Sequence, residues 1–233
     1  TIAITVFATR SYRKNINAKP KGLSNLFEIL MEFIKSDIVI PNIGQKGYKV
    51  WTPLIATFFL FILVGNFIGM IPFFEKIQLI FPGVSGSSTI TGNFTVTAAL
   101  SIITFFAIIV AGTMKHGFIG HWKNMIPGGV PAPVLIILIP IEIMGMFIKP
   151  AALMLRLGAN MTAGHIGLVA IFGIPMIIFQ STQSVGVGLG VAVVSVILNT
   201  AIYFLEIIVC LVQAYVFSLL SAVFIGMAIH AEH

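Results

Sequence analysis

The chain has 233 residues, of which 58% are hydrophobic and only 9% are charged, and its mean hydropathy is +1.07. Soluble domains carry about a quarter charged residues, so this composition excludes an ordinary water-soluble domain and predicts an integral membrane protein. The net charge of +6 is unevenly placed, because residues 1–50 carry +5, residues 51–123 carry +2 and residues 124–233 carry −1. A basic flank before apolar segments follows the positive-inside rule and not the pattern of a nucleic-acid-binding protein.

The N-terminal part of the chain divides into an extension and an amphipathic segment. Residues 1–22 begin with Thr and show no signal peptide. We expect them to form an N-terminal extension, and removal of a transit peptide before it is an open alternative. Residues 23–40 place Leu26, Leu30 and Ile34 on one helical face. This segment is too polar to cross a membrane, so we predict a helix that lies on the membrane surface. The alternative is a helix that packs against another subunit.

Two apolar segments of ordinary length follow. Residues 51–74 and 94–114 are predicted to form a transmembrane hairpin, with a turn-rich link at residues 75–93. Basic residues precede the first span and follow the second, so both ends of the hairpin are expected on one side of the membrane. The histidines near the basic loop and the C-terminus are expected in solvent: His116, His121, His230 and His233.

The remaining two apolar segments are unusually long. Residues 134–178 and 186–229 would each be ~65 Å long as helices, against a hydrocarbon core of ~30 Å. Residues 191–225 contain neither Gly nor Pro, which disfavours a chain that doubles back. We therefore predict two long, strongly tilted helices joined by residues 179–188. The predicted fold is all-α and membrane-embedded, in a single domain over residues 1–233.

Both long segments carry a narrow stripe of polar side chains. Side chains seven residues apart share one face of a helix. The first stripe holds Glu142, Lys149, Arg156 and Asn160, and the second holds Asn199, Glu206 and Gln213. His165 lies nine residues after Arg156 and therefore points away from it, so the two side chains should serve different surfaces.

Ionisable groups inside a bilayer usually mark an ion pathway, because burying them there is expensive. This favours a functional role for Arg156 and Glu206, whereas for His165 and Glu142 a purely structural role is an equal alternative. Asn160 and Gln213 could also bond one helix to another, Lys149 could reach the membrane surface, and the lone Cys210 is expected to pack as a small apolar residue. Glu and His can relay protons, whereas Arg keeps its proton and can block a proton path. The two polar stripes together therefore predict a gated proton route.

Four stretches of the chain closely resemble subunit a, also called subunit 6, of the F-type rotary ATP synthase. They are residues 52–72, 94–117, 140–165 and 205–230. The stretch "PIEIMGMFIKPAALMLRLGANMTAGH" (140–165) is the most specific, and only about the first 20 residues find no counterpart. The resemblance implies a stator subunit that conducts protons through two offset half-channels and couples their flow to ring rotation and ATP synthesis. Its implied partners are the c-ring, peripheral-stalk and other Fo subunits and membrane lipid, with no cofactor, metal, nucleotide or nucleic acid.

The resemblance also implies a role for each polar residue. Arg156 would separate the half-channels with Gln213 beside it, Glu206 and His165 would line the lumenal access channel, and Asn160 and Glu142 would lie along the proton route. Many bacterial members have a carboxylate at position 165 and a histidine at position 206. The arrangement here resembles the mitochondrial and alphaproteobacterial branch, which favours the mitochondrial inner membrane over the alternative, a bacterial plasma membrane. Mitochondrial members often begin with an extra transmembrane helix, which residues 1–22 cannot form.

Two other classes of membrane protein fit less well. A secondary transporter would show discontinuous helices and two related halves, and a haem-binding electron carrier would need pairs of intramembrane histidines. Only His165 lies well inside an apolar segment. The chain has no G-x-x-x-x-G-K-[ST] phosphate loop, so we expect ATP to be made on other subunits.

Overall fold

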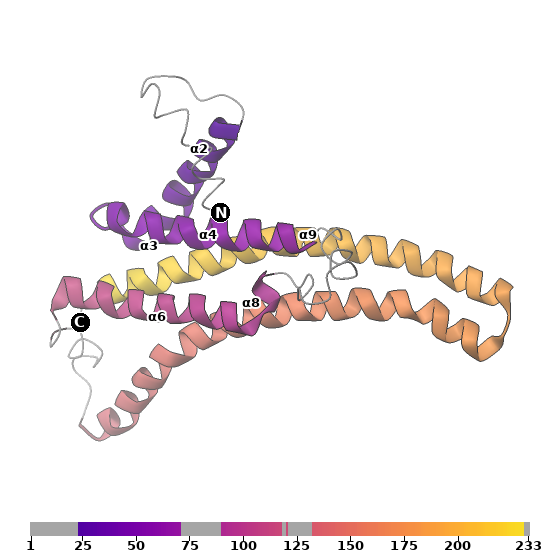
Figure 1. Cartoon of the computed structure of the whole chain (residues 1–233). Coiled ribbons are helices and arrows are strands. Elements are labelled where there is room, and N and C mark those ends of the chain that lie inside the picture. The colour runs from indigo at the N-terminus through magenta and orange to yellow at the C-terminus, as the bar shows by residue number, and fades with distance from the viewer. Residues whose placement is uncertain (1–22, 71–89, 118–119, 121–131, 231–233) are drawn as a thin grey trace.

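The computed structural model describes residues 23–70, 90–117, 120 and 132–230, and every regular element among them is a helix (Figure 1). By length and composition, four of these helices could cross a membrane. They are α4 (Tyr48–Met70), α6 (Phe94–His116), α8 (Ala132–Thr182) and α9 (Val185–Ile229). The predicted all-α membrane fold is therefore confirmed. The predictions for residues 1–22, residues 75–89, His121 and His233 fall outside the described residues.

The amphipathic segment is helical, and its apolar side chains are exposed in the first half but buried in the second. It comprises α2 (Leu23–Phe33), the π-helical η1 (Ile34–Val39) and α3 (Ile40–Ile43). In α2 the Leu26 side chain is 63% exposed, whereas Ile34 in η1 is fully buried. The segment η1 packs against α4 and α9, so the predicted surface helix ends inside the core of this chain. The prediction considered only the membrane surface or another subunit and missed this packing within the chain.

The transmembrane hairpin consists of α4 and α6. The predicted spans were residues 51–74 and 94–114, so α4 begins three residues earlier and α6 ends two residues later. Asn93 precedes α6, and its side-chain oxygen accepts a hydrogen bond from the backbone N–H of Thr95 at 2.9 Å. The start of α4 and the ends of α6 and α9 lie at the same end of the molecule, on the left of Figure 1. This end is the basic end, as the charge pattern predicted.

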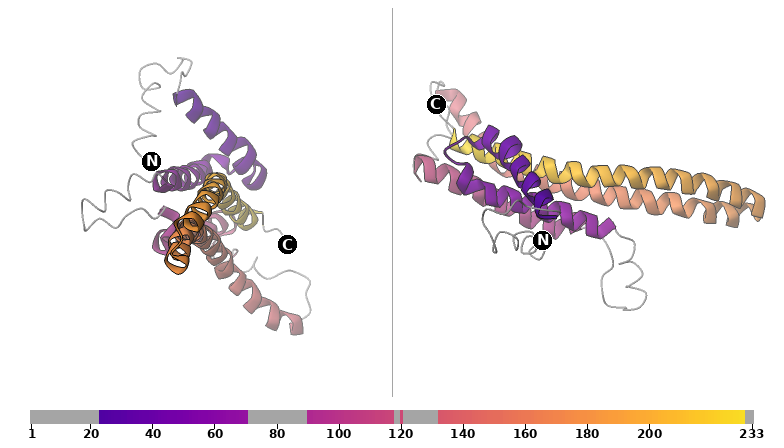
Figure 2. Two further views of the ribbon diagram at one scale, coloured as in Figure 1. Left: turned by 90° about the vertical axis from the view of Figure 1, so that its right-hand side faces the viewer. Right: turned by 90° about the horizontal axis from the view of Figure 1, so that it is seen from above.

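The two long apolar segments form one antiparallel hairpin, α8–α9. The two helices have 51 and 45 residues and extend beyond α4 and α6 (Figures 1 and 2). At 1.5 Å per residue they are ~77 and ~68 Å long, so their tilt in a membrane stays a prediction. The axis of α8 is bent, and Pro140, Pro150 and Pro175 each remove a backbone N–H donor from this helix.

The connection between α8 and α9 is far shorter than predicted. Only Gln183 and Ser184 separate the helices, and Gln183 adopts the left-handed backbone conformation with φ 53°. The predicted link comprised residues 179–188. Gly188 is instead buried in α9, where a Cβ would lie 3.2 Å from the ring of Phe179. The glycine allows the two helices to approach closely and does not form the turn.

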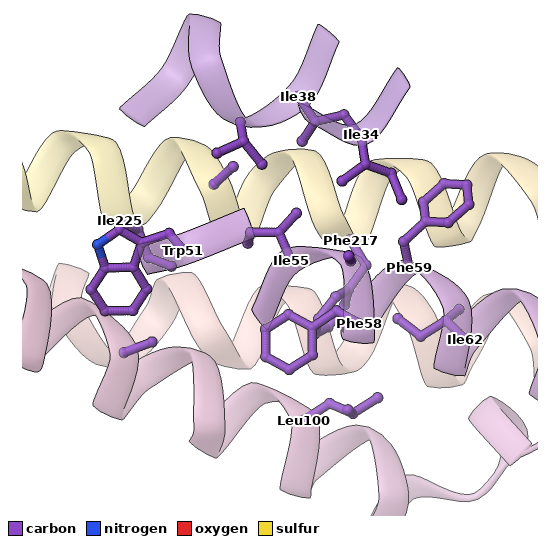
Figure 3. Packing of buried hydrophobic residues seen from close by; sticks show 14 of the residues in the cluster. Ile34, Ile38, Trp51, Ile55, Phe58, Phe59, Ile62, Leu100, Phe217 and Ile225 are labelled. Carbon is purple, nitrogen blue, oxygen red and sulfur yellow. The ribbon is translucent and has the colours of Figure 1, made fainter. Parts of the chain in front are cut away.

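A hydrophobic core holds η1, α4, α6 and α9 together (Figure 3). Phe58 of α4 and Phe217 of α9 meet edge to face with ring centroids 5.5 Å apart. Ile55 and Ile62, about one turn before and one turn after Phe58 on α4, are fully buried on the same side. This packing fixes α9 against the hairpin. It thereby sets the position of the polar side chains that come before Phe217 in α9.

The contact between α9 and α3 depends on Gly226. A Cβ at this position would overlap the carbonyl oxygen of Asn42. We expect Gly226→Ala to lower the free energy of unfolding by about 1–3 kcal/mol, because overpacking forces the backbone apart. Thermal unfolding in detergent measures the change.

Gly190→Ala is the matched control, because nothing lies within 4 Å of a Cβ at Gly190 on the same helix. It should leave the stability unchanged or raise it by up to about 1 kcal/mol through helix propensity. Equal melting temperatures for the two alanine variants would contradict the close contact at Gly226.

Candidate functional site

The structure brings together His165 of α8 and Glu206 of α9. The Nε2 atom of His165 lies 3.9 Å from Oε1 of Glu206, and the two side chains are 28% and 3% exposed. They are 41 residues apart in the chain and meet because α8 and α9 run antiparallel from a two-residue connection. A carboxyl and an imidazole at this distance can exchange a proton through a small shift or one water molecule.

Gly164 makes room for the Glu206 side chain against α8. A Cβ at Gly164 would lie 3.1 Å from Oε1 and 3.7 Å from Cγ of Glu206. Any larger residue at this position would push the carboxyl away from α8. The glycine therefore positions the carboxyl beside His165, and the sequence analysis did not single it out because its role depends on the neighbouring helix.

A cavity of about 550 Å³ opens beside this pair. It is lined by Met70 of α4, by α8 from His165 to Phe172 and by α9 from Val196 to Glu206. From Glu206 the cavity follows both long helices toward their connection, away from the basic end of the molecule. It therefore leads from the buried carboxyl to the opposite end of the spans.

Several polar atoms at the cavity lack hydrogen-bond partners among the described residues. They are Oδ1 of Asn199, Nε2 of His165 and both carboxyl oxygens of Glu206. Buried polar groups in proteins are almost always hydrogen-bonded to protein or to ordered water. The lining can therefore hydrogen-bond to water molecules or carry a proton into the interior.

Three lining residues extend the set that the sequence predicted. Asn199 and Tyr203 lie seven and three residues before Glu206 on α9, and the Tyr203 hydroxyl donates to the Met70 carbonyl oxygen at 2.8 Å. Met70 also accepts a weak hydrogen bond from the buried Cys210 thiol, with 3.1 Å between the sulfur atoms. The seven-residue spacing indicated Asn199, whereas no pattern indicated Met70 or Tyr203.

Arg156 lies on a different surface from His165, as the helical spacing predicted. Its side chain is exposed and makes no hydrogen bond or ion pair with any described residue. Asn160 is exposed one turn farther along the same face. Apart from Lys149 and Asn160, the neighbouring positions on this face carry small side chains, namely those of the exposed Ala152, Ala159 and Ala163. Small residues on an apolar helix face allow another transmembrane helix to approach closely.

The other predicted site residues lie apart from the histidine–glutamate pair. Gln213 is buried in α9, with 5% of its surface exposed, and it does not line the cavity. Glu142 belongs to α8, but its side chain lies outside those that the structure describes. Within the described residues, no group of three His, Cys, Asp or Glu side chains could hold a metal ion.

Comparison with known proteins decides the family. The sequence profile of the family described as ATP synthase A chain matches residues 1–226. The chain belongs to this family. The match begins at the first residue, so the expectation that the first 20 residues find no counterpart is wrong.

The relatives within the ATP synthase A chain family include three bacterial proteins. An ATP synthase subunit a of Chloroherpeton thalassium is 42% identical over 93% of this chain and 59% of its own length. An ATP synthase subunit a 2 of Chlorobaculum tepidum is 40% identical over 97% and 58%. A subunit a of Chlorobium phaeobacteroides is 38% identical over 100% and 62%. The chain therefore spans about three fifths of the length of these relatives.

These relatives support the alternative location and not the first one. They are bacterial, which fits the bacterial plasma membrane that the sequence analysis gave as the alternative to the mitochondrial inner membrane. The family and its multiple apolar helices agree with a multi-pass membrane subunit. The assignment to the mitochondrial and alphaproteobacterial branch finds no support in these relatives.

A disulfide tests the contact between α8 and Glu206. In a Cys210→Ala background, the pair Gly164→Cys and Glu206→Cys should oxidise readily, because the Cγ of Glu206 marks the place of a cysteine sulfur 3.7 Å from the Cβ at position 164. Mass spectrometry of the digested protein after mild oxidation detects the linked peptides. The pair Gly167→Cys and Glu206→Cys is the control, since nothing lies within 4 Å of a Cβ at Gly167. Equal linkage of both pairs would contradict this packing of α8 on α9.

Proposed function

We propose that this chain is the proton-conducting stator subunit of the Fo motor of an F-type ATP synthase. The chain would form two offset half-channels against a ring of c subunits and couple proton flow to the rotation of this ring. Membership of the ATP synthase A chain family supports the proposal. The observation that carries it is the exposed Arg156 on a membrane-spanning helix face.

A guanidinium at this position needs an anion that the described residues do not supply. Arginine keeps its charge at any physiological pH, and an unpaired charge in hydrocarbon is expensive. Among the described residues no carboxylate pairs with Arg156. The small side chains of Ala152, Ala159 and Ala163 would let an apolar helix with a carboxylate approach this face. A ring subunit with one membrane-embedded carboxylate fits both requirements.

The cavity beside Glu206 fits the entry half-channel. It points away from the basic end, which the positive-inside rule places in the cytoplasm, and so toward the positive side of an energised membrane. Asn199 and Thr200 line the way to Glu206. Glu206 and His165 would pass a proton from this cavity to a ring carboxylate.

In the proposed cycle the proton leaves by a second path. The neutralised ring carboxylate can face lipid, so the ring can turn by nearly one revolution until the carboxylate meets the exit half-channel. There the carboxylate releases its proton, and the resulting anion is attracted to Arg156. Arg156 cannot carry a proton itself and therefore prevents direct flow between the half-channels. Each charge that crosses is worth ~2.3 kcal/mol per 100 mV, so such a leak would waste the gradient.

The remaining residues take the roles that the resemblance implies. Gln213 would help to position Arg156, and Asn160 and Glu142 would lie along the proton route. The order of the pair, histidine at 165 and glutamate at 206, corresponds to the mitochondrial and alphaproteobacterial arrangement, here in a chain with bacterial relatives. We expect the c-ring, the peripheral stalk and other Fo subunits as partners, with nucleotide chemistry on other subunits.

Arg156→Ala tests the central role. We expect ATP synthesis and ATP-driven proton pumping to be lost in membrane vesicles while the complex still assembles, because the half-channels are no longer separated. Arg156→Lys should rescue poorly, since a buried lysine can lose its proton. Lys149→Gln is the control. It removes a cation seven residues before Arg156 on the same helix and should retain pumping. Normal synthesis with Arg156→Ala would refute the proposal.

An exchange of residues tests the entry pair. Glu206→Gln and His165→Ala should each reduce proton pumping by at least about 100-fold, because each removes a proton-relay group. The double variant His165→Glu with Glu206→His should recover a large part of the rate, since the two groups stay adjacent with their roles exchanged. A double variant as inactive as the single variants would show that the pair does not act as one relay.

A further inference from the structure

A second cavity lies at the basic end of the molecule, where α4 begins and where α6 and α9 end. Its volume is about 470 Å³, a size typical of small-molecule sites. Its polar wall contains Gln45 and Lys46 before α4, Lys115 at the end of α6 and His230 after α9. No acidic side chain lines it. Lysines from two separate parts of the chain thus direct positive charge into one small space.

The backbone of the turn before α4 adds further donors to this wall. Gly44 has φ 86°, a left-handed conformation that favours glycine, and its carbonyl oxygen accepts from the N–H of Tyr48 at 3.2 Å. Among the described residues the backbone N–H groups of Gln45 and Lys46 find no acceptor. Free N–H groups beside the start of a helix are suited to an anion, and here the two lysines reinforce them.

Two carbonyl groups at the end of α9, beside this cavity, have histidine partners. The Nε2 atom of His116 lies 3.1 Å from the carbonyl oxygen of Ile229, the last residue of α9. The Nδ1 atom of His230 lies 2.9 Å from the carbonyl oxygen of Gly226 and therefore donates to it. Both histidines were expected in solvent, and this is wrong for His116, which is partly buried against α9. These two carbonyl groups are occupied, and no acidic side chain in the lining offsets the charge of Lys46 and Lys115.

The other wall of the cavity is apolar. Val50 and Met114 line it and are 58% and 68% exposed, and Trp51 lies next to them in the first turn of α4. All three belong to membrane-spanning helices close to the basic end, where tryptophan typically lies at the interface of a membrane. A ligand that fills the cavity therefore meets positive charge on one side and a lipid-facing apolar surface on the other.

We propose that this cavity binds the phosphate group of an anionic phospholipid of the cytoplasmic leaflet. The phosphate would lie between Lys46 and Lys115, with its oxygens near the free N–H groups of the turn. The glycerol and the upper acyl chains would lie against Val50, Trp51 and Met114. A free inorganic phosphate would use only the polar wall, whereas a phospholipid matches both. The lipid would link the ends of α4, α6 and α9 at the membrane surface.

The site is distinct from the proposed proton route. Glu206 and His165 lie at the cavity that extends toward the other end of the spans, and no residue lines both cavities. Lipid binding can therefore be measured without proton pumping, and its failure would leave the stator proposal untouched.

The test titrates the purified chain in mild detergent with phosphatidylglycerol and counts bound lipids by native mass spectrometry. The double variant Lys46→Gln with Lys115→Gln should weaken binding by roughly 30-fold, and each single variant by about fivefold, as expected for the loss of one charge near the membrane surface. Both lysines are exposed, so the melting temperature should be unchanged.

The matched control is the double variant Lys35→Gln with Lys49→Gln. It removes the same charge from the same end of the molecule, but neither residue lines the cavity. We expect less than a twofold change in its affinity for phosphatidylglycerol. Equal weakening by both double variants would reduce the effect to general surface charge and overturn the proposal.

Two further arms identify the ligand. Zwitterionic phosphatidylcholine with the same acyl chains, whose phosphate is balanced by a choline cation, should bind more weakly than phosphatidylglycerol to the unaltered chain. The two lipids should bind equally to the double variant at Lys46 and Lys115. Inorganic phosphate should not displace the lipid at millimolar concentration. Displacement by phosphate, or equal binding of the two lipids, would overturn the assignment to an anionic phospholipid.

Discussion

A charge inside the hydrocarbon of a bilayer has to be paired, hydrated or moved to the surface, and the arrangement of α8 and α9 follows from this constraint. Glu206 is covered by α8 because Gly164 leaves space for its carboxyl, and a largely apolar cavity that also contains Asn199 and Thr200 reaches it. Arg156 is treated in the opposite way, because it lies exposed on a face of small side chains. Glu206 is thus enclosed by other parts of the chain, whereas Arg156 has no partner among the described residues.

The two ends of the molecule differ in a way that suits directional transport. Lysines and histidines gather where α4 begins and where α6 and α9 end. The cavity at Glu206 extends toward the other end, along the part of α8–α9 that reaches beyond the hairpin (Figure 1). Charge is expected to orient the chain in the membrane, while packing decides toward which end the cavity beside Glu206 extends.

Much of this was predictable from hydrophobic periodicity and charge. The all-α membrane fold and the opposite directions of Arg156 and His165 follow from helical geometry alone. The predicted link at residues 179–188 was too long, because the sequence alone does not show that Gly188 lies within α9 as a point of contact with Phe179. The burial of Ile34 was missed for a related reason, since an amphipathic pattern does not show which surface covers its apolar face.

The sequence by itself determined which groups can carry or block a proton, because Glu, His and Arg differ in their chemistry wherever they lie. It also determined the stripe on which each group sits, since a long helix without breaks fixes the angle between residues. Only the tertiary structure decided that His165 meets Glu206 at 3.9 Å and that Met70 and Asn199 share their cavity. The physical reason is that contacts between helices depend on the register of α8 on α9, which close packing at small residues sets and periodicity within one helix does not contain.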